Sequence, residues 1–141
     1  MSSLRIGVVG YSPPTQFDEN KARRALNRIF DRIAGNADGK DIAVVSGLTD
    51  VGVPSIAYHT AKERGWRTVG VACSKASEHK CFPVDEQIIV GDDWGDESET
   101  FLGKCDILIR VGGGKQSHTE ATAFKAQGGT VYEFNLAAIS D

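Results

Sequence analysis

Residues 105–120 read Cys105-Asp106-Ile107-Leu108-Ile109-Arg110-Val111-Gly112-Gly113-Gly114-Lys115-Gln116-Ser117-His118-Thr119-Glu120. The mostly apolar, β-branched run at 107–111 indicates a buried strand, the three glycines end it, and a helix is expected from Ser117 to Gln127. Backbone N–H groups at a helix start are unpaired and carry partial positive charge, so a glycine turn in front of them lets a phosphate approach closely. This strand, turn and helix therefore predict a phosphate site.

The predicted phosphate loop has both backbone and side-chain components. The backbone comes from Gly112, Gly113 and Gly114, and the side chains are those of Lys115, Ser117, His118 and Thr119. Glu120 follows in the first turns of the helix, where its carboxylate can face the ligand. The structural alternative is a plain tight turn, with Glu120 complementing the helix dipole. The spacing matches neither the P-loop nor the dinucleotide-binding fingerprint.

The remaining chain repeats the alternation of apolar strands and helices. Strands are expected at 4–10, 41–47, 67–72, 87–91 and 130–134, and helices at 17–34, 55–64 and 97–105, with an irregular polar segment at 73–86. Such alternation predicts a parallel sheet covered on both faces. The fold class expected for residues 1–141 is therefore a single α/β domain, a Rossmann-like three-layer sandwich with a mainly parallel central sheet that binds a nucleotide.

Two further loops follow predicted strands and contribute to the same site. One carries Gly10, Tyr11 and Ser12 after the first strand, and the other carries Ser46, Gly47 and Thr49 after the second. In parallel α/β sheets the ligand binds beyond the carboxyl ends of the strands, where such loops gather. The three loops are expected to form one composite site.

Composition excludes several classes of function. A net charge of −3 gives no general field that would attract nucleic acid, so no nucleic-acid partner is expected. No apolar run is long enough to span a bilayer, and the first residues lack a signal core, so no membrane partner and a cytoplasmic location are expected. The three cysteines form an odd set, which favours reduced thiols over a disulfide framework.

Cysteine, histidine, acidic and tryptophan residues outside the three loops are interpreted as structural rather than functional. Cys73, His79 and Cys81 have irregular spacing and no fourth ligand nearby, so no metal site is expected. The acidic run at 92–99 is interpreted as a solvated loop and helix start. For Trp66 and Trp94, packing on the rim of the core is favoured over stacking on a base.

Three motifs resemble the SLOG superfamily, which includes the Lonely-guy phosphoribohydrolases, the proteins once labelled lysine decarboxylases and the molybdenum-cofactor carrier proteins. Residues 9–12 are similar to its first-strand loop, residues 46–53 to its second glycine motif, and residues 112–120 to the signature Pro-Gly-Gly-x-Gly-Thr-x-x-Glu. The chain departs from that signature because Val111 replaces its proline and Lys115-Gln116-Ser117 replaces its Gly-Thr element. The resemblance covers nearly the whole chain. It implies binding of a nucleotide or phosphorylated ligand at the strand ends, and a homo-oligomer, most simply a dimer.

Two functions remain open at this point. In the first, the chain is a carrier or sensor that binds a nucleotide or a nucleotide-containing cofactor of unspecified identity, which needs only the anion-binding loops. In the second, it is a nucleoside 5′-monophosphate phosphoribohydrolase that cleaves the N-glycosidic bond. That reaction needs a carboxylate to stabilise an oxocarbenium-like transition state, the role expected of Glu120.

Overall fold

The computed structural model describes residues 3–139, which form one six-stranded parallel sheet with helices on both faces. The strands are β1 (Ser3–Gly10), β2 (Asp41–Ser46), β3 (Arg67–Ala72), β4 (Glu86–Ile89), β5 (Ile107–Val111) and β6 (Thr130–Phe134). The helices are α1 (Glu19–Gly35), α2 (Gly52–Glu63), α3 (Ser98–Gly103) and α4 (Lys115–Ala126), with a short 3-10 helix at Ser74–Glu78. The predicted fold class is confirmed, and all strand pairs are parallel.

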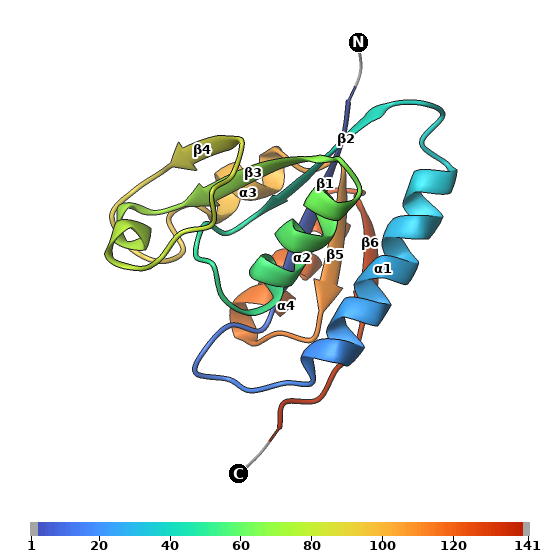
Figure 1. The fold of residues 1–141 in the computed structure, drawn as a ribbon. Coiled ribbons are helices and arrows are strands. Elements are labelled where there is room, and N and C mark those ends of the chain that lie inside the picture. Colours follow the sequence, from blue (N-terminus) through green and yellow to red (C-terminus); the bar gives the residue numbers. More distant parts are fainter. Residues whose placement is uncertain (1–2, 140–141) are drawn as a thin grey trace.

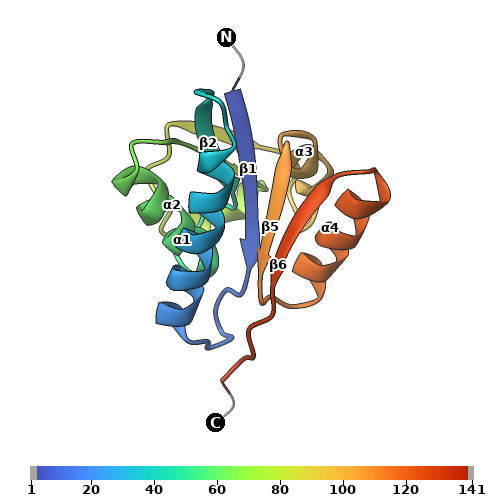
Figure 2. The ribbon, with the colours of Figure 1, turned by 90° about the vertical axis from the view of Figure 1, so that its right-hand side faces the viewer.

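The helices cover the sheet in two layers. Helices α1 and α2 lie on one face and α3 and α4 on the other (Figures 1 and 2). Side chains alternate between the faces along each strand, so Ile6 and Val8 join the core beneath α1 and α2, while Val9 joins the core beneath α3 and α4. Because β1, β2 and β5 are covered on both sides, their sequences are almost continuously apolar.

The strand order places a switch of direction at the centre of the sheet. The order is β4-β3-β2-β1-β5-β6, so the chain moves outward from β1 to β4 and then returns to pair β5 with the other side of β1. Gly10, the last residue of β1, is in register with Val111, the last residue of β5. The loops that leave these two strands therefore diverge from a common point, which is where such sheets bind ligands.

The observed starts of α1, α2 and α4 differ from the predicted ones. Helix α2 starts at Gly52 rather than Ser55, because Pro54 falls in the first turn, where a missing N–H breaks no intrahelical bond. Helix α4 starts at Lys115 rather than Ser117, so the glycine turn is only three residues long. Helix α1 begins two residues later than predicted, after Asp18, whose carboxylate accepts a hydrogen bond from the Lys21 N–H at 3.1 Å.

The remaining predicted elements need smaller corrections. Strand β4 ends at Ile89 and helix α3 spans only Ser98–Gly103. The irregular segment at 73–86 contains the 3-10 helix, and its Cys81 forms an isolated antiparallel bridge with Thr49. All three cysteines are free. Within residues 3–139, no helix is both long enough and apolar enough to cross a membrane.

Candidate functional site

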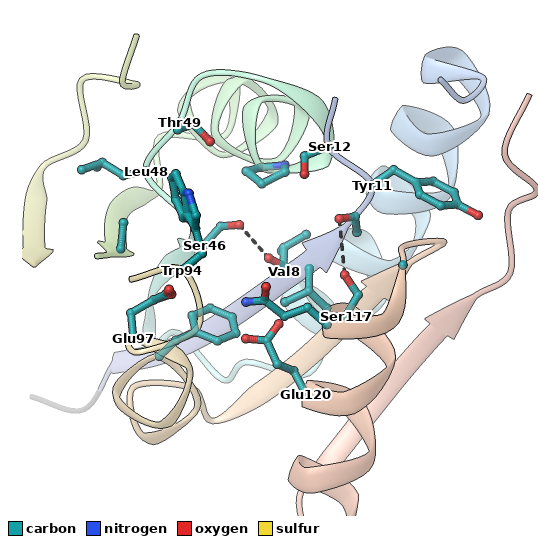
Figure 3. Close-up of a pocket in the computed structure, with 18 of the residues that line it drawn as sticks. Val8, Tyr11, Ser12, Ser46, Leu48, Thr49, Trp94, Glu97, Ser117 and Glu120 are labelled. Atoms are coloured by element: carbon teal, nitrogen blue, oxygen red, sulfur yellow. Dashed lines mark hydrogen bonds between the residues drawn. The ribbon is translucent and has the colours of Figure 1, made fainter. Parts of the chain in front are cut away.

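A pocket of about 430 Å³ opens beyond the carboxyl ends of β1, β2, β3 and β5 (Figure 3). Its size falls within the range of small-molecule sites. All three loops predicted from the sequence reach it, together with the segment that precedes α3. Ten of the predicted residues line it: Gly10, Tyr11, Ser12, Ser46, Gly47, Thr49, Gly114, Lys115, Ser117 and Glu120.

The third loop brings the start of α4 to the pocket. Gly114 occupies the N-cap position in an extended conformation, with φ of −91°, and no side chain caps the helix. Lys115, Gln116 and Ser117 form its first turn and line the pocket. The first N–H groups of a helix have no partner within the helix and carry partial positive charge. This end of the pocket is therefore suited to an anion.

Helix α2 also begins at this edge, but it is not equally available to a ligand. The Val53 N–H donates to the Tyr11 carbonyl at 2.9 Å, and Pro54 has no N–H to offer. Pro54 contributes an apolar wall instead. Of the two helix starts, α4 is the one better suited to an anion.

In the first loop, Tyr11 and Ser12 have different roles. The Tyr11 hydroxyl donates to the Leu136 carbonyl at 2.8 Å, and Figure 3 shows its ring directed away from Ser46 and Glu120. Tyr11 thus anchors the segment after β6. Ser12, by contrast, is exposed and lines the pocket.

The second loop is fixed by buried hydroxyl groups. The Ser46 hydroxyl donates to the Val8 carbonyl at 2.6 Å, so its proton ties β2 to β1 and only its oxygen remains to accept a bond from a ligand. The Tyr58 hydroxyl lies 2.8 Å from the Gly47 carbonyl and 2.9 Å from the Val69 carbonyl. Burial raises the pKa of this phenol, which therefore stays neutral.

Four predicted residues do not reach this pocket. Gly112 and Gly113 adopt positive φ angles of 59° and 101° and shape the turn beneath it. His118 is exposed on α4. Thr119 lines an adjoining groove of about 800 Å³ between α3 and α4, which shares Lys115, Gln116 and Glu120 with the pocket. A helix turns about 100° per residue, so positions 118 and 119 face away from the surface that carries Ser117 and Glu120.

Two carboxylates, Glu97 and Glu120, line the pocket although both are only 8% exposed. The Ser98 hydroxyl donates to Glu120 at 2.9 Å, and the Gln116 amide approaches that hydroxyl at 3.4 Å. Burial raises the pKa of Glu120, the Ser98 and Gln116 hydrogen bonds oppose this rise, and the nearby Glu97 charge adds to it. Glu120 is therefore more readily protonated than an exposed glutamate.

Sequence reasoning missed the contribution of the acidic segment. It expected a solvated loop at 92–99, but Trp94 and Glu97 line the pocket and Glu97 is buried. Two glycines, Gly91 before the acidic run and Gly95 within it, were the signal for a shaped loop, and both adopt positive φ. Trp94, for which the sequence favoured packing on the core rim, is 53% exposed.

Arg110 supports the glycine turn from below. Its guanidinium is buried and donates to the Gly112 carbonyl at 2.7 Å, to the Asn135 side chain at 2.6 Å and to Glu133 at 2.8 Å. An arginine inside an apolar strand was visible in the sequence as an anomaly. It is a positioning residue because it does not line the pocket.

The described part of the chain contains no group of three or more histidine, cysteine, aspartate or glutamate side chains that could hold a metal ion. The polar groups at the pocket are hydroxyls, amides, one lysine and the two glutamates. They suit an organic ligand with an anionic end.

The fold of this chain is similar to that of several solved structures. No protein-family model and no curated protein matches the sequence. The molybdenum cofactor carrier protein of Chlamydomonas reinhardtii is 24% identical, with a TM-score of 0.72 over 94% of this chain and 76% of that one.

Two other solved structures also have a similar fold. The molybdenum cofactor binding protein of the phototrophic bacterium Rippkaea orientalis is 24% identical, with a TM-score of 0.75 over 96% of this chain and 78% of that one. The protein TM1055 is 22% identical, with a TM-score of 0.68 over 91% and 72%. At this identity the likeness concerns the fold, and it confirms the structural resemblance expected from the sequence motifs.

Proposed function

We propose that this protein binds a phosphorylated, nucleotide-like ligand in the pocket beyond the strand ends, as a carrier or sensor. The observation that carries the proposal is the uncapped start of α4, which opens into a pocket at the switch point between β1 and β5. A phosphate placed there accepts hydrogen bonds from the backbone N–H groups and is favoured by the helix dipole. Lys115 adds a positive charge at the same end.

The names of the similar structures support a small-molecule carrier. Two of them are described as a carrier and a binding protein for the molybdenum cofactor. That cofactor is the first ligand to test, as cargo rather than as a resident catalytic group.

The test is a thermal-shift and calorimetric panel on the intact protein. The panel contains molybdenum cofactor, adenosine and guanosine 5′-monophosphates (AMP and GMP), the parent nucleosides and ribose 5-phosphate. A ligand that binds only the folded state raises the melting temperature by mass action. We expect phosphorylated members to raise it and unphosphorylated nucleosides to raise it much less. No shift with any phosphorylated member would overturn the proposal.

A second candidate function rests on Glu120, whose buried carboxylate lines the pocket. In a phosphoribohydrolase this carboxylate would stabilise the developing oxocarbenium ion or activate water. The Glu120→Gln variant should then keep ligand affinity but lose several kcal/mol of transition-state stabilisation, a loss of orders of magnitude in turnover. The measurement is release of free base from nucleoside monophosphates by parent and variant. No release by the parent excludes hydrolysis of those substrates.

A further inference from the structure

The acidic segment between β4 and α3 forms a fixed loop. The Asp96 carboxylate accepts hydrogen bonds from the backbone N–H groups of Asp92 at 3.1 Å and Asp93 at 3.0 Å. The Glu97 carboxylate accepts one from the Gly95 N–H at 2.8 Å. Carboxylates that bond to backbone donors in this way hold a turn in one conformation.

The loop is also tied to the segment after β3. The Ser74 hydroxyl donates to Asp92 at 3.0 Å, and the Lys75 ammonium lies 2.9 Å from Asp93. The acidic residues therefore bond within the loop and to its neighbour. What the loop presents at its tip is Trp94.

Trp94 lines the pocket from the side of this loop. Figure 3 shows its indole on the side of the pocket away from Tyr11, and Ser46 and Leu48 line the same pocket. It is 53% exposed, although a tryptophan in a packed site would be largely buried. The only aromatic contact recorded for it among residues 3–139 is His79, with ring centroids 5.9 Å apart and planes tilted by 45°. A large part of the indole is thus left without a protein partner.

The pocket lining offers two kinds of surface. The start of α4 with Lys115 and nearby hydroxyl groups can bind an anion, and the Trp94 indole with Leu48 and Pro54 gives apolar surface. A ligand with a phosphate at one end and a flat aromatic ring at the other satisfies both. Stacking on a tryptophan suits any heteroaromatic ring because each has a π-face.

We propose that Trp94 is a ligand-binding residue whose indole stacks on the planar heterocycle of the phosphorylated ligand. This inference rests on the proposed function and specifies its ligand class: a ring-bearing phosphate rather than a bare sugar phosphate. The hydrogen bonds of the acidic loop hold the backbone around Trp94 in one conformation before the ligand arrives, so little backbone freedom is lost on binding.

The test compares GMP with ribose 5-phosphate by calorimetry on the parent, Trp94→Ala and Trp94→Phe. We expect Trp94→Ala to weaken GMP binding roughly ten- to a hundredfold and to leave ribose 5-phosphate binding within about twofold. Trp94→Phe should retain part of the GMP affinity. Because Trp94 is exposed, both variants should unfold at the same urea concentration as the parent.

Tryptophan fluorescence independently measures whether GMP contacts the Trp94 indole, because the chain has only two tryptophans. Trp66 packs edge-on against Phe30 at 5.1 Å on the α1 side of the sheet, so Trp66→Phe leaves Trp94 as the only indole. GMP should quench the emission of Trp66→Phe and leave that of Trp94→Phe unchanged.

The outcomes separate the two proposals. GMP and ribose 5-phosphate binding with equal affinity, or Trp94→Ala binding GMP as the parent does, overturns the stacking role while phosphate binding stands. An equal loss for both probes in Trp94→Ala also overturns it, because the loop then acts on the whole site. If the parent binds neither GMP nor ribose 5-phosphate, the stacking role is overturned, and the proposed function is overturned as well if no phosphorylated member of the wider panel binds.

Discussion

Gly113 and Gly114 are neighbours with different backbone requirements. Gly113 has a φ of +101°, and a Cβ built there would lie 2.5 Å from the Ser117 Cβ, whereas a Cβ on Gly114 would meet no atom within 4 Å. A side chain at Gly113 is therefore strained both by its backbone angle and by its neighbour.

We expect Gly113→Ala to lower the free energy of unfolding by roughly 1–3 kcal/mol and Gly114→Ala to change it by less than about 0.5 kcal/mol. Urea unfolding of the two variants against the parent measures the difference. Equal losses would show that the turn relaxes around a new Cβ.

The buried carboxylate of Glu120 gives stability an unusual dependence on pH. Because burial raises its pKa in the folded protein, folding favours the protonated form, and this contribution is lost as pH rises through the folded-state pKa. We expect Glu120→Gln to be more stable than the parent at pH 7, with a difference that shrinks as pH falls towards 4.5. The exposed Glu99→Gln on α3 is the matched control for the loss of a glutamate charge. A difference independent of pH would contradict the assignment.

At the scale of the element, the missing side-chain cap at the start of α4 lowers the stability of the helix but leaves its first N–H groups open to an anion. Gly114→Asp places a carboxylate at the N-cap, where it should stabilise the helix by a few tenths to about 1 kcal/mol. The same charge repels a phosphate, so affinity for ribose 5-phosphate should fall at least about tenfold. Gly114→Asn is the control, because it can cap the helix without a charge and should weaken binding less. Unchanged affinity in Gly114→Asp would place the phosphate elsewhere.

Strand β5 carries a buried arginine that couples the glycine turn to the end of β6. Arg110→Met leaves the Gly112 carbonyl and the Glu133 carboxylate without this donor. Removing one partner of a fully buried pair costs about 3–5 kcal/mol, but Glu133 retains water contact and the Lys125 ammonium, so we expect about 2 kcal/mol. Chemical denaturation measures this loss. A change below about 0.5 kcal/mol would mean that the turn holds without Arg110.

At the scale of the whole molecule, we expect a homodimer, as the family resemblance implies. The large apolar side chains that are exposed in residues 3–139 are Val51, Ile89, Trp94 and Ile139, and none of them lies within a helix. None of these four side chains could therefore belong to an interface formed by apolar residues of the helices. Light scattering at micromolar concentration measures the mass, and a monomer would contradict the prediction.

The sequence by itself determined the architecture because the patterns that indicate strands and helices lie within short segments of the chain. Apolar runs such as 107–111, each ended by glycine and followed by an amphipathic segment, are sufficient to indicate buried parallel strands with crossover helices. The carboxyl ends of parallel strands share one edge, so the sequence also predicted which three loops meet. Ten of the predicted residues do line one pocket there. Their role in binding remains a prediction.

Tertiary structure decided which atoms of those residues face the pocket. The Ser46 hydroxyl donates to Val8 and the Tyr11 hydroxyl to Leu136, partners 38 and 125 residues away that no local pattern specifies. Trp94 and Glu97 enter the site for the same reason. Their loop is placed by bonds to Ser74 and Lys75, and its acidic composition alone is typical of a solvated surface. Local sequence determines secondary structure through backbone and burial preferences, whereas the chemistry at the pocket depends on contacts between distant segments that form only when the sheet is assembled.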